Sequence, residues 1–140
     1  MLAAVLLAAS QTGYADEPSV DAPAFKMGIH LGSYHEQPGY NNFNPGVFIR
    51  STGDFYGVMG AYYNSESSPS VYVGAGYEFK YFGLMVGAVT GYQRNAVSPI
   101  ALPYLKLPVD IGPLSAIRVG VIPRVKSIND GWVAHLMAEF

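Results

Sequence analysis

The sequence has no cysteine and few charged residues. Without cysteine there is no disulfide framework, no thiol nucleophile and no zinc site built on thiolates. Charged residues make up only 13% of the chain, well below the roughly 25% that is usual for soluble domains. The net charge is -2 and the eight Lys and Arg are scattered, which argues against a nucleic-acid-binding protein, because such proteins concentrate basic residues on one surface.

Long apolar runs are also missing, although half of the residues are hydrophobic. Beyond the N-terminus, Gly, Pro, Asn, Ser or a charged residue interrupts every apolar run before it reaches the roughly 18 residues of a membrane-spanning helix. A closed β-barrel is the other structure that can cross lipid, because it pairs every backbone group. The 11 Tyr and 16 Gly are typical of such a barrel, with aromatic residues at its two interfaces and glycines in its curved wall.

The first residues resemble a secretion signal. Residues 1–9 form a short apolar run, and Gly13-Tyr14-Ala15 places small residues where a signal peptidase cuts. We therefore predict a signal peptide over residues 1–15 and a barrel domain over residues 16–140. The alternative is a first helix buried in the fold.

The rest of the chain alternates between apolar and polar or small residues in short segments separated by turn residues. We predict eight strands, at 24–34, 44–51, 55–64, 70–79, 82–92, 100–108, 114–122 and 131–140. The connections between them alternate between short ones, at 51–54, 80–81 and 110–113, and mostly longer ones, at 35–43, 65–69, 93–99 and 123–130. Short periplasmic turns and longer outer loops are the pattern of outer-membrane barrels.

The last segment alternates most clearly. One face carries apolar residues from Trp132 to Phe140, while His135 and Glu139 fall on the other face. The fold class that we predict is all-β, a closed antiparallel eight-stranded transmembrane β-barrel of the outer-membrane type. The inward positions of the fourth and fifth strands are mostly small, which predicts a narrow lumen or one that holds a slender ligand. An edge strand of a soluble sandwich is the alternative for the last segment.

Polar residues gather where the first and third strands reach the outer rim. His30 lies near Ser33 and His35, and Asn64-Ser65 closes the third strand. His30 alternates with apolar residues, so it points toward the lumen or the rim. A lone histidine of this kind is more often a satisfied polar residue than a catalyst.

In several patches the chain resembles the outer-membrane lipid A palmitoyltransferases. The resemblance runs from about Pro23 to Phe140, with matching order and spacing. The patches that carry it are Ile29-His30, Tyr40-Asn41, Pro45-Gly46, Ala61-Tyr62-Tyr63-Asn64-Ser65, Ala75-Gly76-Tyr77, Pro99-Ile-Ala-Leu-Pro-Tyr-Leu-Lys-Leu-Pro108 and Ile122-Pro123.

The resemblance implies an acyltransferase that moves a palmitoyl chain from a glycerophospholipid to lipid A. The family's required histidine corresponds to His30, which would act as general base toward the acceptor hydroxyl. Its Asp-Ser pair corresponds to Asn64 and Ser65, which would position the ester and stabilise its oxyanion. Asn64→Asp would then be neutral or activating.

The resemblance also assigns residues to the acyl chain. Pro103 and Pro123 match a place where the family's wall opens between strands six and seven, because proline lacks the N–H that pairs strands. Turn formation is the alternative for each proline. Glu78 falls near the position that limits chain length in the family, and an inward Glu there would shorten or block the chain.

The hypothesis from the sequence is thus a lipid A palmitoyltransferase-like enzyme in the bacterial outer membrane. We expect a membrane-embedded monomer with phospholipid and lipid A as partners, no nucleic acid, no metal and no cofactor. The main alternative is a non-enzymatic barrel with a structural, adhesive or surface-protective role, acting through loops 35–43 and 123–130. A small pore and a soluble lipocalin-like binder are more remote alternatives.

Overall fold

The structure, a computed structural model, describes residues 24–124 and 131–140. The predicted signal peptide at 1–15 and most of the predicted loop 123–130 lie outside these residues. Within the described ranges, no helix has the length and apolar character needed to cross a membrane.

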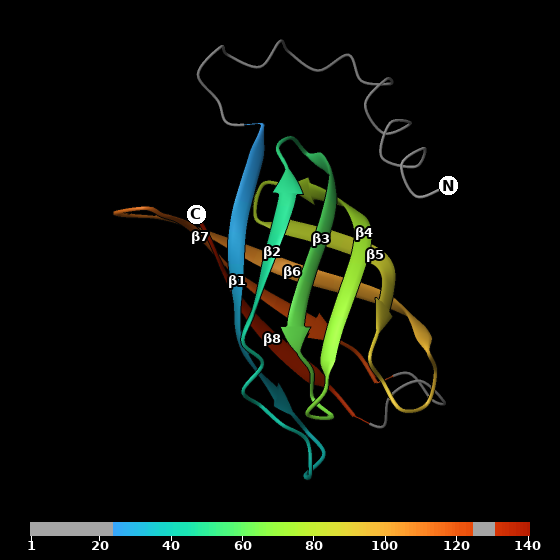
Figure 1. Cartoon of the computed structure of the whole chain (residues 1–140). Helices are drawn as coiled ribbons and strands as arrows, with labels where there is room; N and C mark the ends of the chain where they lie inside the picture. The colour runs from blue at the N-terminus through green and yellow to red at the C-terminus, as the bar shows by residue number, and fades with distance from the viewer. Residues whose placement is uncertain (1–23, 125–130) are drawn as a thin grey trace, which may run out of the picture.

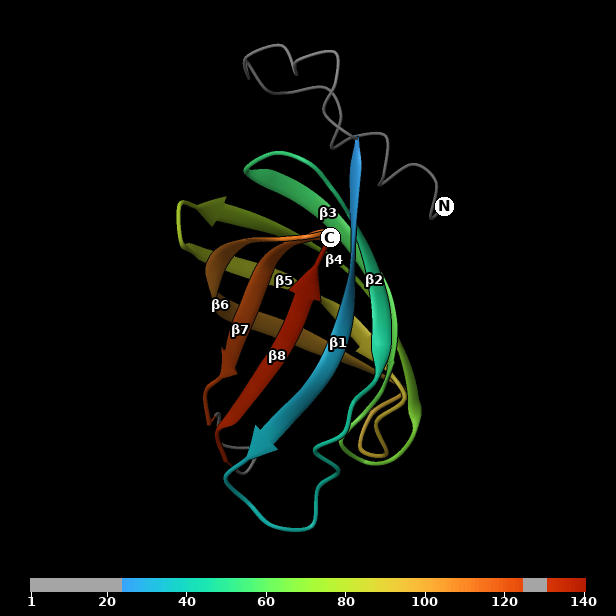
Figure 2. The same cartoon turned by 90° about the vertical axis from the view of Figure 1, so that its left-hand side faces the viewer.

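Eight antiparallel strands form one closed barrel, in which each strand pairs with the next along the chain and β8 pairs with β1 (Figures 1 and 2). The strands are β1 Phe25–His35, β2 Gly46–Ser51, β3 Phe55–Tyr63, β4 Pro69–Phe79, β5 Phe82–Thr90, β6 Val97–Ile111, β7 Leu114–Ile122 and β8 Val133–Glu139. The predicted all-β class, strand number and closure are confirmed.

Side chains alternate between the lumen and the outside of the wall along most of each strand, and irregularities in the register interrupt the alternation in β1 and β6. In β4, Tyr72 and Glu78 are buried while Val73 and Tyr77 are exposed. In β8 the predicted faces are confirmed, since Glu139 is fully buried and Leu136 is 40% exposed. A period of two residues places the apolar residues on the outside because successive side chains leave a strand on opposite faces.

The connections segregate as the sequence predicted. The short ones, at 52–54, 80–81 and 112–113, lie at the end where β1 begins and β8 ends, and the longer ones lie at the opposite end (Figure 1). Gly53 and Gly112 have φ values of 108° and 58°, and Lys80 has 50°. Tight hairpin turns require such left-handed backbone, which glycine adopts without strain.

Strand β6 is longer than predicted, Val97–Ile111 instead of 100–108. Three prolines, Pro99, Pro103 and Pro108, lie within the strand. Lys106 donates its backbone N–H to the Tyr81 carbonyl on the β5 side. Backbone nitrogens of successive residues point to opposite neighbouring strands, so the nitrogens of Pro99 and Pro103 face β7 and that of Pro108 faces β5. At each of these positions the strand has no partner on that side, so the missing N–H removes no hydrogen bond.

Glycines on the lumen face make room for tyrosines from other strands. A Cβ on Gly76 would lie 2.3 Å from Cζ of Tyr56, and one on Gly83 would lie 2.2 Å from Cζ of Tyr104. The small inward positions therefore do not leave an open lumen here. The middle of the lumen is filled by a core of buried side chains: Phe48, Tyr56, Val58, Tyr72, Met85, Val89, Leu102, Tyr104 and Met137.

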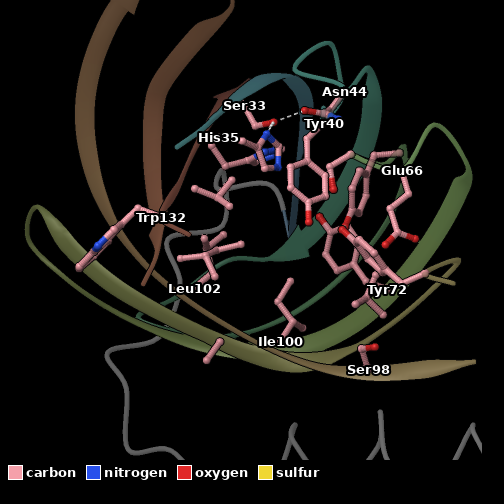
Figure 3. Close-up of a pocket in the computed structure, with 18 of the residues that line it drawn as sticks. Ser33, His35, Tyr40, Asn44, Glu66, Tyr72, Ser98, Ile100, Leu102 and Trp132 are labelled. Atoms are coloured by element: carbon pink, nitrogen blue, oxygen red, sulfur yellow. Dashed lines mark hydrogen bonds between the residues drawn. The ribbon is translucent and has the colours of Figure 1, made fainter. Parts of the chain in front are cut away.

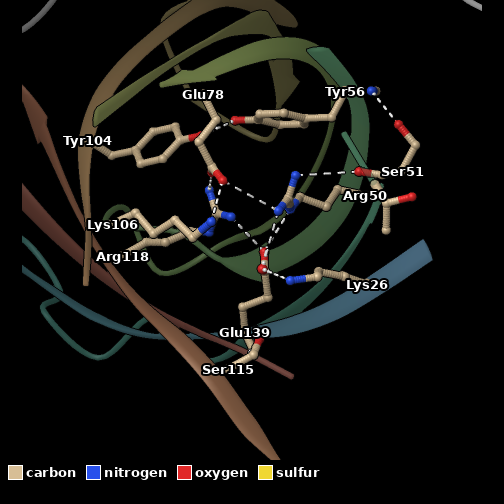
Figure 4. A network of polar contacts seen from close by, with 12 residues as sticks. Lys26, Arg50, Ser51, Tyr56, Glu78, Tyr104, Lys106, Ser115, Arg118 and Glu139 are labelled. Atoms are coloured by element: carbon tan, nitrogen blue, oxygen red, sulfur yellow. Dashed lines mark hydrogen bonds and ion pairs between the residues drawn. The ribbon is translucent and has the colours of Figure 1, made fainter. Parts of the chain in front are cut away.

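Charged side chains fill the lumen near the short turns (Figure 4): Lys26, Arg50, Glu78, Lys106, Arg118 and Glu139. Arg50 Nε lies 2.7 Å from Glu139 Oε2, and Arg118 Nη1 lies 2.6 Å from Glu78 Oε2. Each arginine also reaches the other glutamate, at 3.7 Å for Arg50 and 2.8 Å for Arg118. The two arginines and two glutamates thus form a closed ring that joins four strands across the lumen.

Candidate functional site

A cavity of about 510 Å³ occupies the lumen at the end with the longer connections (Figure 3). Its floor is formed by apolar side chains from the core, including Met85, Val89, Leu102 and Met137. Its mouth is lined by polar residues from several strands and loops, among them Ser33, Asn44 and Ser65. The volume lies within the roughly 300–1,000 Å³ that is usual for small-molecule sites, and the arrangement suits a ligand with a polar head and an apolar tail.

His30 sits at the boundary between the floor and the mouth, and only 6% of it is exposed. Its Nδ1 lies 2.8 Å from Nε2 of His135, and its Nε2 lies 3.0 Å from the hydroxyl of Tyr72. Its ring also contacts Phe48 and Tyr62, at centroid distances of 5.5 and 5.2 Å. Both nitrogens of His30 are thus engaged by protein groups, so neither is open to the acceptor hydroxyl that the sequence-based hypothesis assigned to it.

All three histidines of the chain line this cavity. The sequence placed His30 and His35 at the rim, but it gave His135 no role in the site. The signal was present, since alternation turns His135 inward in the last strand, but the register that brings Ser33 opposite His135 is visible only in the barrel. Among residues 24–124 and 131–140, no group of three or more His, Asp or Glu is placed to hold a metal ion.

Hydrogen bonds hold His35 at the mouth. Its Nδ1 lies 2.8 Å from Oδ1 of Asn42, and its ring stacks on Tyr40 at a centroid distance of 5.0 Å. Ser33 donates its hydroxyl to Oδ1 of the buried Asn44 and also lies 3.4 Å from Nδ1 of His35. The loop between β1 and β2 therefore fixes the orientation of the His35 ring.

Ser65 lines the cavity from the connection between β3 and β4. Its side chain forms a hydrogen bond with Tyr92, whose hydroxyl lies 2.9 Å from that of Tyr62. Burial raises the pKa of the Tyr92 phenol above its usual value, so this hydroxyl stays neutral at ordinary pH. Ser65 thus belongs to a chain of neutral hydroxyl groups along one wall.

Asn64 does not enter the cavity. Its side-chain nitrogen donates to Ser70 Oγ at 2.9 Å and to the Gly91 carbonyl at 2.8 Å. Its side-chain oxygen accepts from the backbone N–H groups of Glu66 and Ser68, at 2.9 and 3.0 Å. Two donors and two acceptor positions are all that a carboxamide offers, so no group of Asn64 remains to polarise an ester. Its geometry fits an organiser of the turn between β3 and β4, and not the oxyanion role.

We therefore expect Asn64→Asp to destabilise the barrel instead of being neutral or activating. The carboxylate keeps the two acceptor contacts, loses both donors, and lies against the Gly91 carbonyl in a fully buried position. Losing buried partners in this way costs about 1–3 kcal/mol. Urea unfolding in detergent micelles measures the change, with the exposed Asn95→Asp as the matched control. Equal stability of both variants would contradict the structural role.

Pro103 and Pro123 flank an unpaired part of the wall. Pairing between β6 and β7 begins at Tyr104 and Gly120, so residues 97–103 pair with β5 alone. Pro99, Ala101 and Pro103 are exposed on the outer face and nevertheless line the cavity. The cavity therefore opens sideways through the wall as well as at its mouth.

Glu78 lies in the charge network below the cavity and does not line it. The Tyr104 hydroxyl donates to it at 2.9 Å, and Lys106 Nζ lies 2.6 Å away. The residues that close the cavity from below are Tyr72, Met85, Leu102 and Met137. The position of Glu78 thus does not fit the predicted role of limiting an acyl chain from within the cavity.

Comparison with known proteins adds no family to this description. No protein-family model matches the chain, and no curated protein matches it.

Proposed function

We propose that this barrel is an outer-membrane acyltransferase, similar to the lipid A palmitoyltransferases, that moves an acyl chain from a glycerophospholipid to lipid A. Its outer surface supports a place in lipid, because large apolar side chains cover it between two groups of exposed aromatic residues. The aromatic residues near the short turns are Phe25, Phe55, Tyr77, Phe79, Tyr81, Phe82 and Phe140, and those near the longer connections are Tyr34, Phe43 and Tyr63.

The observation that carries the proposal is the combination of an apolar floor, a mouth with three histidines and a side opening between β6 and β7. A lipid can enter such a cavity from within the bilayer with its chain first, because the opening connects the outer surface to the floor. The chain then lies against Met85, Leu102 and Met137, and the ester that joins it to glycerol remains at the level of the histidines.

The reaction that fits this placement is a transesterification. The hydroxyl oxygen of the acceptor forms a bond to the acyl carbon, the bond between that carbon and the glycerol oxygen breaks, and the acceptor proton passes to the glycerol oxygen. An imidazole is suited to move this proton, because its ordinary pKa lies near neutrality. The products are acylated lipid A and a lysophospholipid.

A non-enzymatic barrel is the second candidate. It is favoured by the turn role of Asn64 and by the absence, among the described residues, of a carboxylate hydrogen-bonded to any of the three histidines. Such a barrel would act through its outer loops, and its cavity would bind no substrate.

Mass spectrometry of lipid A separates the two candidates. Cells that produce the protein should gain a lipid A species heavier by one acyl chain, and His30→Ala should reduce this species at least tenfold because it removes the partner of both His135 and Tyr72. Asp110→Asn, exposed near a short turn at the far end of the barrel from the cavity, is the control and should retain the product. If the wild type gains no such species while the folded barrel is present, the acyltransferase proposal is wrong.

A further inference from the structure

We infer that His135 and His35, not His30, face the reacting ester, with His135 donating an N–H to the carbonyl oxygen and His35 accepting the proton of the acceptor hydroxyl. This inference rests on the proposed function and assigns its two chemical roles. It follows from the hydrogen bonds that fix which nitrogen of each ring carries the proton.

The chain of bonds from Tyr72 determines the state of His135. The Tyr72 side chain is buried, and Nε2 of His30 is the hydrogen-bond partner of its hydroxyl. A buried phenol must donate its proton or leave it unsatisfied, so Tyr72 donates to Nε2 of His30. A neutral His30 then carries its proton on Nδ1 and donates it to Nε2 of His135. Neutral His135 is left with its proton on Nδ1.

Nδ1 of His135 is the last group in this series of hydrogen bonds. No described residue forms a hydrogen bond with it, and the His135 side chain lines the cavity. His135 therefore presents an N–H to whatever occupies the cavity. Because it receives a hydrogen bond at Nε2, this N–H is oriented before a ligand arrives, which is the requirement for stabilising a developing oxyanion.

The bond to Asn42 determines the opposite state of His35. Oδ1 of Asn42 can only accept, so Nδ1 of His35 carries the proton. Neutral His35 is then left with an unprotonated Nε2, and no described residue is bonded to that atom. The stacked Tyr40 ring and the bond to Asn42 hold the imidazole in place at the mouth.

The barrel places the two rings as diagonal neighbours on the lumen face. His135 lies opposite Ser33 on the adjacent strand, and His35 is two residues further along that strand. Side chains in this relation have Cα atoms about 7–8 Å apart, which leaves room for an ester and a hydroxyl between them. Both rings are more exposed than His30, which is a positioning residue for His135 in this arrangement.

The step balances with these two groups. Nε2 of His35 takes the proton of the acceptor hydroxyl as its oxygen attacks the acyl carbon, and Nδ1–H of His135 hydrogen-bonds to the carbonyl oxygen as negative charge develops on it. When the glycerol oxygen leaves, it takes the proton back from His35. His135 keeps its proton throughout.

Nitrogen NMR of the full barrel in detergent micelles tests the assignment directly, at a pH where the imidazoles are neutral. We expect a proton on Nδ1 of His135 and on Nδ1 of His30, with a coupling between His30 and His135 across their shared hydrogen bond, and an unprotonated Nε2 on His35. Tyr72→Phe should remove the constraint and give His30 mixed states. The opposite tautomer on either His135 or His35 overturns the inference.

Activity measurements separate the two roles. His135→Leu should lower the rate of acyl transfer about 10²–10³-fold without changing the shape of the pH profile, because it removes a donor. His135→Gln keeps an N–H donor and should recover part of the rate. His35→Gln should lower the rate about 10²–10⁴-fold and remove the fall in rate on the acid side of the profile. If His35→Gln retains the wild-type rate and profile, His35 is not the base.

The two proposals fail differently. A wild-type barrel that shows the expected tautomers but transfers no acyl chain overturns the proposed function. The assignment of His135 as a hydrogen-bond donor and His35 as an acceptor then still holds. A barrel that transfers acyl chains with the opposite tautomers overturns only the assignment of His135 and His35.

Discussion

Glu139→Gln is expected to lower the free energy of unfolding by about 3–5 kcal/mol, the usual cost of removing one partner from a buried ion pair. Glu139 is fully buried and contacts three cations, at 3.4 Å for Lys26, 2.7 Å for Arg50 and 2.8 Å for Arg118. Gln has nearly the same shape, so the change removes charge without creating a cavity. Arg50 and Arg118, which are 4% and 3% exposed, then share Glu78 alone.

Urea unfolding in detergent micelles measures this loss, and fluorescence of the single Trp132 reports the transition. Asp110→Asn is the matched control, because Asp110 is exposed near a short turn at the same end of the barrel. The control should change stability by less than about 0.5 kcal/mol. If both variants unfold at the same urea concentration as the wild type, the ring of charges does not stabilise the barrel.

A disulfide across the opening between β6 and β7 is expected to stop acyl transfer reversibly. If the ladder continued one step beyond Tyr104 and Gly120, Pro103 would lie opposite Val121, and both side chains are exposed on the outer face. The double variant Pro103→Cys with Val121→Cys should therefore form a bond that closes the opening. The chain has no cysteine of its own, so no other disulfide competes.

The oxidised double variant should produce at least tenfold less acylated lipid A than the same protein after reduction. Each single cysteine variant is a control, because it changes the side chain without joining the strands. Undiminished transfer by the oxidised form, with the disulfide verified by mass, would show that lipid does not enter between β6 and β7.

The sequence was sufficient for the architecture of this protein. Alternation with a period of two residues identified eight strands and the lumen face of β8, because side-chain direction in a strand depends only on position along the chain. The segregation of short and long connections followed from the same pattern. The predicted span of β6 was too short by three residues at each end, because the sequence does not show where a strand has a partner on only one side and can still contain proline.

The site itself was decided by tertiary structure. The sequence placed His30 and Ser65 near one rim, but His30 and His135 are 105 positions apart, and the register between β1 and β8 alone brings their nitrogens within 2.8 Å. Asn64 and Glu78 were assigned by resemblance to roles that their contacts do not fit, because a residue type does not reveal its hydrogen-bond partners. Arg50 and Glu139 are 89 positions apart and meet only because the barrel closes. Periodicity along one strand fixes the face on which a side chain lies, whereas the closure of the sheet fixes what it meets there.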